Sequence, residues 1–264
     1  MMFLSIVLMV LGLIGIIVCQ KKQKTNPNAQ GLAVVCLIII LAGAGLLLWE
    51  NGMLPGAGDR EMDRIMANET RFTEARSKVM GEYIGKTWNG QNAVIITEPG
   101  LDKNPIAKAG VAAMEETLKK AGVNVTATEA LNLPENADGP APMEMALTAK
   151  IYNDIFNAHK DANLFIIMSQ LPFNGQELQK MKCWSFNPKK QRVVLVSGEI
   201  YNLKGAIAAG FIGAAAAMKT GPEAYDPEKA APKDVQAAFD TRFILVTPEN
   251  VKDIAEKNKD LFAK

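Results

Sequence analysis

Two long apolar stretches occupy the first part of the chain, and each has the length of a membrane-spanning helix. Between residues 2 and 18 the only polar side chain is Ser5, and residues 31–49 carry no charged side chain. A helix of about 20 residues crosses the hydrocarbon core of a bilayer. The segment between them, residues 19–30, contains an Asn-Pro-Asn turn signal. We therefore expect a transmembrane hairpin of two helices.

The charge pattern of the hairpin predicts its orientation. Lys21, Lys22 and Lys24 are the only charged residues before Glu50, and all three lie in the connecting segment. Positive charge in short loops stays on the cytoplasmic side. The loop is predicted to be cytoplasmic, with both termini and the C-terminal domain extracytoplasmic. Arginines at positions 60, 64 and 71 weaken this bias, although acidic residues are interleaved with them.

A cleaved signal peptide is the competing interpretation of the first stretch. The chain has no basic residue before this stretch, whereas a signal peptide begins with a basic region. Ile17 and Val18 before Cys19 also fit a small-residue cleavage site poorly. Two spans remain the preferred prediction.

Five short apolar runs, each bounded by turn residues, predict the strands of a sheet. Four are continuously apolar, as expected of strands buried on both faces of a parallel sheet. The second run alternates, which is typical of an edge strand. Helical patterns separate the runs, which favours right-handed crossovers. Strands are expected at residues 93–96, 123–128, 164–168, 193–196 and 243–246, and helices at 59–83, 105–121, 143–159, 177–181, 203–219 and 251–262.

These elements predict an α/β fold class. The hairpin is followed by a single Rossmann-like, three-layer αβα domain with a five-stranded parallel sheet in the order 2-1-3-4-5, which places the alternating run at an edge. The expected organisation is a hairpin over residues 1–49, a linker and amphipathic helix over 50–84, and the α/β domain over 85–264.

Residues 203–219 are the most ambiguous part of this pattern. Their uncharged stretch, residues 205–218, is too short to span a membrane. Small residues at positions 205, 209, 213 and 217 recur every four positions, so we expect a buried helix that lies close to the sheet. Two long loops are expected at 132–142 and 220–241, and loops of that length are uncommon unless they bind something or are irregular.

Ligands of open parallel sheets bind beyond the carboxyl ends of the strands. The strand assignments put polar side chains there that are able to hold a hydroxyl-rich or amide-bearing ligand. Structural roles are the alternative, because Asn202 can cap a helix and Thr247 with Pro248 fits a helix start. Thr247 and Glu249 follow the last strand. The predicted ligand-binding residues are Thr97, Glu98, Asp102, Ser169, Gln170, Ser197, Glu199, Tyr201 and Asn202.

Composition excludes several kinds of chemistry. The chain has 29 basic and 28 acidic residues, which argues against nucleic acid as a partner. His159 is the only histidine and Cys183 the only cysteine after residue 49, so neither a His/Cys metal site nor a disulfide framework is expected in the globular part. No metal or cofactor is predicted, although an all-oxygen cation site stays possible.

Catalytic signatures are missing from the sequence. It contains no Walker A motif, no G-x-G-x-x-G after the first strand and no G-x-S-x-G elbow. Cys183, beside Trp184, is expected to be buried rather than nucleophilic. His159, at the end of a predicted helix, fits a surface cation. We therefore assign no catalytic residue.

Two segments carry a resemblance to a known family. Residues 199–218 (EIYNLKGAIAAGFIGAAAAM) followed by 243–254 (FILVTPENVKDI) resemble the C-terminal lobe of type I periplasmic binding proteins, the sugar-binding and LacI-like group. The resemblance implies a non-enzymatic, ligand-recognising lobe over residues 85–264 that lies outside the cytoplasm. That family closes two lobes around its ligand, whereas this chain has room for one. A protein partner, or a second copy in a homo-oligomer, would then be needed to enclose a small ligand.

The preferred function is a membrane-anchored, non-catalytic binding, sensing or interaction module of the cell envelope that recognises a small polar ligand or a protein partner. One alternative is an envelope enzyme that uses Glu98, Asp102 or Glu199 in acid–base roles. Another is a structural subunit of a membrane complex, in which the hairpin is the functional part.

Overall fold

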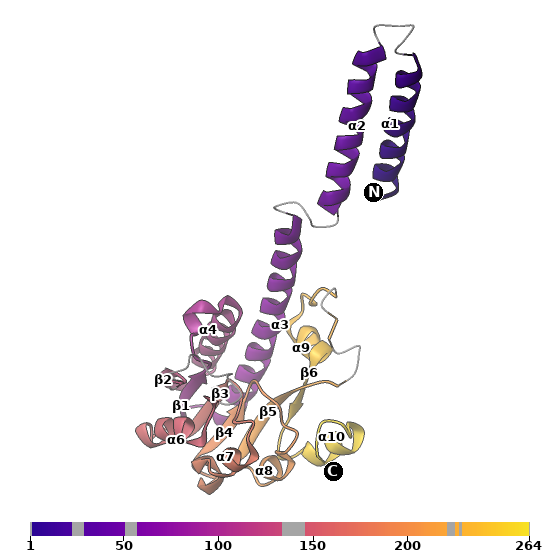
Figure 1. Cartoon of the computed structure of the whole chain (residues 1–264). Coiled ribbons are helices and arrows are strands. Elements are labelled where there is room, and N and C mark those ends of the chain that lie inside the picture. The colour runs from indigo at the N-terminus through magenta and orange to yellow at the C-terminus, as the bar shows by residue number, and fades with distance from the viewer. Residues whose placement is uncertain are drawn as a thin grey trace. The chain divides into compact units, whose positions relative to one another are not determined.

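The computed structural model describes residues 2–22, 29–50, 57–133, 146–220, 225–226 and 229–263 (Figure 1). The chain divides into two compact units, Met1–Met66 and Ala67–Lys264. Each unit is described by itself.

The first unit is built around two antiparallel apolar helices, α1 (Met2–Lys22) and α2 (Ala29–Glu50). Within them, Ser5–Lys22 and Gly31–Leu48 are long and apolar enough to cross a membrane. Only 17% and 6% of the residues in these two windows are buried, whereas the core helix of a globular protein is mostly buried. The sequence prediction of two apolar helices is confirmed.

Small residues bring α1 and α2 together. A Cβ atom on Gly12 would lie 2.6 Å from a side-chain carbon of Ile40, and one on Gly43 would lie 2.9 Å from Cγ of Met9. Gly45, in contrast, has nothing within 4 Å of its Cβ position. The small residue at position 43 therefore allows α2 to pack closely against α1 within the hairpin.

The second unit contains the sheet and the helices around it. The strands are β1 (Asn92–Thr97), β2 (Asn124–Ala130), β3 (Leu164–Met168), β4 (Arg192–Leu195), β5 (Ile212–Met218) and β6 (Phe243–Val246). The helices are α3 (Ala57–Trp88, of which residues 67–88 belong to this unit), α4 (Pro105–Lys120), α6 (Ala149–Ala158), α7 (Gly175–Gln179), α8 (Lys204–Ala208), α9 (Val235–Arg242) and α10 (Val251–Lys257), with short 3₁₀ turns η1 (Leu101–Lys103) and η2 (Lys182–Ser185).

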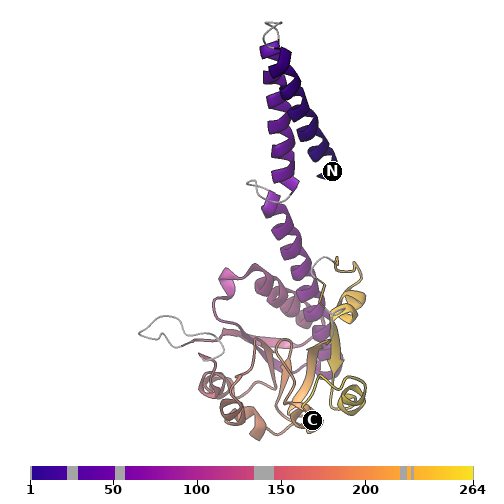
Figure 2. The ribbon, with the colours of Figure 1, turned by 45° about the vertical axis from the view of Figure 1, so that its right-hand side comes forward.

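Helices cover both faces of the sheet, as Figures 1 and 2 show. On one face α3, α4 and α9 pack against alternate strand residues such as Ile95 and Ile166. On the other face α6, α8 and α10 pack against the neighbouring residues, such as Ile96 and Ile167. Because successive strand side chains point to opposite faces, a continuous apolar run fills both cores. The predicted three-layer arrangement is correct.

The sheet has six strands rather than the predicted five, in the order β2-β1-β3-β4-β5-β6. The first five strands in this order are parallel, and β2 lies at an edge as predicted. β6 pairs with β5 in the antiparallel direction. The five-stranded, fully parallel sheet was therefore a wrong prediction, and the additional strand is β5.

The helix predicted over residues 203–219 is also wrong. It ends after α8, and residues 212–218 form β5 between β4 and β6. The local sequence Gly-Ala-Ala-Ala-Ala has high helix propensity, but a buried position between two strands outweighs so weak a preference. A short apolar run cannot be assigned to a helix or a strand by periodicity alone.

Other boundaries were predicted with mixed success. The predicted loop at 220–241 contains α9, whose first turn is capped by the Asp234 carboxylate accepting from the Ala237 N–H at 2.8 Å. α10 begins at Val251, so Thr247 and Pro248 form a turn before the helix rather than its first residues. Most of the predicted loop at 132–142 lies outside the described residues.

Candidate functional site

The candidate site lies at the edge where the parallel strands β1, β3 and β4 end. Glu98 follows β1, Ser169 follows β3, and Ser197 comes two residues after β4. All three line one cavity of about 370 Å³, within the usual size range of small-molecule pockets. The strand-end rule therefore placed these residues together correctly.

A smaller space of about 130 Å³ adjoins this cavity on the side of α4. Arg76, Glu98, Met168 and Ser197 line both spaces. The two hollows thus share one wall.

The carboxylate of Glu98 is held in place by the start of α4. Asn104 donates from Nδ2 to Oε1 of Glu98 at 2.6 Å, and its own Oδ1 accepts from the N–H groups of Ile106 and Ala107 at 3.1 Å. One residue therefore caps the helix and orients the carboxylate. No hydrogen bond to the second carboxylate oxygen of Glu98 is found among the described residues.

The turn after β4 depends on Gly198. Its φ is +101°, a backbone conformation that side-chain-bearing residues rarely adopt. A Cβ there would also stand 3.5 Å from the backbone Cα of Gln170. This turn sets Ser197 and Glu199 on the cavity wall.

Arg76 is the site residue that sequence reasoning missed. It projects from α3, and its Nε is buried without a hydrogen-bond partner among the described residues. The guanidinium lies 5.1 Å from the ring centre of Phe243, which also lines the cavity. A signal was present in the sequence, because Arg76 lies four residues after Phe72 and three before Val79, on the apolar stripe of the helix.

Burial lowers the pKa of Arg76 to about 10, and the charges of Glu69 and Glu98 oppose this effect. The guanidinium is still protonated at neutral pH. The loss of hydration outweighs the attraction of the two carboxylates, which makes the burial of this charge unfavourable for folding. Its position at a cavity wall indicates a place for a ligand group.

Four of the predicted ligand-binding residues extend the site toward α7 and α8, where they form its rim. Gln170, Glu199, Tyr201 and Asn202 line a further hollow of about 80 Å³, together with Phe173. Phe173 and Tyr201 are each 49% exposed, unusual for aromatic side chains of the second unit. Asn202 does not cap α8, since the residue before the helix is Leu203.

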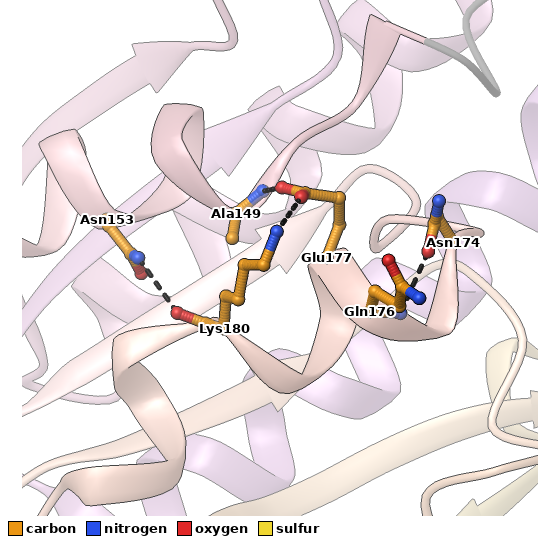
Figure 3. Close-up of polar contacts among 6 residues, drawn as sticks. All are labelled: Ala149, Asn153, Asn174, Gln176, Glu177 and Lys180. Atoms are coloured by element: carbon orange, nitrogen blue, oxygen red, sulfur yellow. Dashed lines mark hydrogen bonds and ion pairs between the residues drawn. The ribbon is translucent and has the colours of Figure 1, made fainter.

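A polar network fixes α7, which forms one side of this rim (Figure 3). Glu177 accepts from the N–H of Ala149, the first residue of α6, at 3.0 Å and from Nζ of Lys180 at 2.7 Å. These hydrogen bonds lower the pKa of Glu177, that from Lys180 more than that from Ala149. Asn153 of α6 donates to the carbonyl of Lys180 at 3.1 Å. The rim near Phe173 is thereby held against α6.

Two predicted site residues have other positions. Asp102 lies in η1, has a side chain 95% exposed, and pairs with Lys108 at 3.8 Å, so it does not reach the cavity. Thr97 is buried and lines only the smaller space; its hydroxyl donates to the carbonyl oxygens of Glu98 at 3.4 Å and Glu129 at 3.5 Å.

The residues after β6 do not join this edge. Because β6 runs antiparallel to β5, Thr247 and Glu249 follow its carboxyl end, which lies at the edge where the parallel strands begin. There Thr247 and Glu249 interact with Tyr83 near the end of α3. Their assignment to the strand-end edge was wrong for this topological reason.

Cys183 and His159, the residues with the most reactive side-chain types, take part in packing and in an ion pair rather than lining the cavity. Cys183 is fully buried, and burial raises the pKa of its thiol to about 12, so it is not a nucleophile. His159 ends α6, and its Nε2 lies 3.0 Å from a carboxylate oxygen of Glu129. Among the described residues, no group of three or more His, Cys, Asp and Glu side chains is arranged to hold a metal ion.

Comparison with known proteins gives structural neighbours only. No protein-family model matches the sequence, and no curated protein matches it. The neighbours are periplasmic sugar-binding proteins of ABC transporters, the group that residues 199–218 and 243–254 resemble.

Three of these neighbours are a periplasmic ribose ABC transporter protein from Conexibacter woesei (TM-score 0.45, 14% identity, 70% of this chain), a carbohydrate transporter solute-binding protein from Agrobacterium radiobacter in complex with D-arabinose (0.45, 18%, 74%), and a Caulobacter myo-inositol-binding protein (0.43, 14%, 69%). This chain spans 60%, 63% and 60% of their respective lengths.

Proposed function

We propose that this chain is a membrane-anchored binding or sensing module of the cell envelope, non-catalytic, which recognises a small polar ligand at the carboxyl ends of β1, β3 and β4. The observation that carries this proposal is the cavity of about 370 Å³ that is lined by Arg76, whose Nε is buried, by Glu98 and by the hydroxyl-bearing Ser169 and Ser197. A few polar groups around a largely apolar hollow are typical of ligand sites.

Membrane anchoring is supported by the surface of the hairpin. Leu11, Leu32 and Leu41 are each at least 60% exposed. Exposed apolar surface of this extent is unfavourable in water and is satisfied in lipid. The three lysines of the connecting segment favour a cytoplasmic loop and an extracytoplasmic binding domain.

The proposal is tested by native mass spectrometry of the full-length chain, purified gently in mild detergent from its source cells. We expect an added mass of small-molecule size that is lost after denaturation and refolding. A protein partner retained in its place would make this an interaction module, and a bare chain would contradict ligand binding.

A cavity-filling variant supplies the site control. Ser197→Tyr places a large ring in the cavity and is expected to abolish the added mass. Ser185→Tyr makes the same change at an exposed position of η2 and is expected to retain the added mass. Equal retention by both variants would place the ligand elsewhere.

A further inference from the structure

The cavity is lined by side chains of both signs of charge, and one buried N–H of its arginine has no acceptor among the described residues. The Nε of Arg76 has no acceptor among the described residues. The two nearby carboxylates do not fill this role, because Glu69 pairs with Arg242 at 2.7 Å and Glu98 accepts from Asn104. The Nε of Arg76 is therefore a buried donor without the acceptor that such a group normally has.

Three charged side chains line the cavity: Arg76, Glu98 and Glu199. A ligand with only negative charge would pair with Arg76 but would meet two carboxylates, which repel it. A neutral ligand would bring no charged acceptor to the buried Nε of Arg76. A ligand with a carboxylate and an ammonium group satisfies both signs.

We propose that the cavity binds a small zwitterion, an α-amino acid, with its carboxylate on Arg76 and its ammonium group on the free oxygen of Glu98. This inference rests on the proposed function and narrows its ligand class. Guanidinium groups match carboxylates through paired N–H donors, and a carboxylate is the natural acceptor for an ammonium group.

The walls of the cavity suit the remainder of such a ligand. Met168, Ala216 and Phe243 supply apolar surface inside, while Phe173 and Met218, 49% and 50% exposed, supply it at the mouth. Ser169 and Ser197 line the same cavity and add two hydroxyl-bearing side chains to it. An amino-acid side chain would rest on the apolar part.

Equilibrium dialysis of the full-length chain in mild detergent, stripped of ligand by unfolding and refolding, tests this inference. The probes are an equimolar mixture of the twenty L-amino acids, a mixture of ribose, arabinose, glucose and galactose, and inorganic phosphate. We expect retention from the first mixture only. The amide and the α-hydroxy acid of the retained amino acid, which lack one charge each, should bind at least about 30-fold more weakly.

Matched arginine variants separate recognition from folding. Arg76→Gln should abolish retention, and Glu98→Gln should weaken the amino acid more than its α-hydroxy acid. Arg192 is the control, since its Nε is equally buried without a partner among the described residues, but it stacks on Trp88 at 5.1 Å and does not line the cavity. Arg192→Gln should bind as the natural chain does, and thermal unfolding verifies that each variant is folded.

Each result is decisive. Retention of sugars or phosphate without amino acids would overturn the zwitterion inference and leave the ligand-binding proposal intact. Equal binding of the amino acid, its amide and its α-hydroxy acid would overturn the assigned roles of Arg76 and Glu98. If no probe binds and native mass spectrometry finds a bare chain, the inference and the proposed function both fail.

Discussion

Arg76 and Arg242 of the second unit differ in their partners, and the difference predicts opposite effects on stability. Arg242 is 3% exposed, pairs with Glu69 at 2.7 Å and lies 3.5 Å from the ring centre of Phe72. The Nε of Arg76 has no partner among the described residues, and the charges of Glu69 and Glu98 only partly offset the cost of its burial. We expect Arg242→Met to lower the free energy of unfolding by about 3 kcal/mol, because it leaves the Glu69 carboxylate unpaired. Arg76→Met should raise it by about 1 to 2 kcal/mol.

The pH dependence of the stability change on Arg76→Met follows from the direction in which the pKa of Arg76 is shifted. The pKa of Arg76 is lowered to about 10 in the folded chain, below its ordinary value of 12.5. The unfolded chain therefore binds more protons between these values, and the penalty from Arg76 disappears only as the pH rises through that range. The gain from Arg76→Met should be constant between about pH 6 and pH 9. Urea unfolding of the full chain at several pH values measures it, and a gain that fades below pH 8 would show that the buried charge of Arg76 is not its cause.

The buried thiol of Cys183 should resist alkylation. Its pKa of about 12 leaves about one thiol in ten thousand ionised at pH 8, and the side chain is not exposed. We expect iodoacetamide to leave Cys183 unmodified in the folded chain and to modify it fully in urea. Peptide mapping by mass spectrometry distinguishes it from Cys19 and Cys36, and rapid native labelling would contradict the packing around it.

Strand ends made most of the candidate site predictable. Glu98, Ser169 and Ser197 each follow an apolar run whose assignment was correct, and parallel strands bring such ends to one edge. Arg76 could not be found by that rule, because it comes from a helix before the first strand. The error at Thr247 has a different cause, since the direction of β6 depends on its pairing with β5.

At the level of elements, β5 shows where local sequence stops being informative. Ala214, Ala215, Ala216 and Ala217 are good helix formers, yet they form a buried strand. Small side chains fit there because both faces of β5 are covered by packed helices. The five other strands were predictable, since their apolar runs are short, rich in Val, Ile and Leu, or alternating.

Close packing at the start of β5 gives a prediction at this scale. A Cβ on Gly213 would lie 2.8 Å from an aromatic carbon of Trp88 and 2.9 Å from Cδ of Arg192. We expect Gly213→Ala to lower the free energy of unfolding by about 1 to 3 kcal/mol through overpacking.

Gly205→Ala in α8 is the matched control for this change. Nothing lies within 4 Å of its Cβ position, so the same substitution should be neutral or stabilise by up to about 1 kcal/mol. Chemical denaturation compares the two variants. Equal effects at both positions would show that the contact between β5 and Trp88 is not tight.

For the whole molecule, the charge pattern of the two apolar helices predicts the side of a membrane on which the C-terminal domain would lie. Lys21 and Lys22 lie in the last turn of α1, and Lys24 follows it in the connection to α2. A fluorescent reporter that matures only in the cytoplasm, fused after Lys264, should stay dark, while an alkaline phosphatase fusion at the same position should be active.

Moving the positive charge provides the control for this prediction. Replacing the three lysines by glutamine and adding three lysines after Met1 should invert the reporter pattern, because the positive-inside bias is then reversed. The mass of the recovered chain distinguishes two spans from a cleaved leader, since cleavage after Val18 would remove most of α1. Fluorescence of the cytoplasmic reporter on the natural chain would contradict the prediction and place the C-terminal domain in the cytoplasm. A ligand of the cavity lined by Arg76 would then be a cytoplasmic solute.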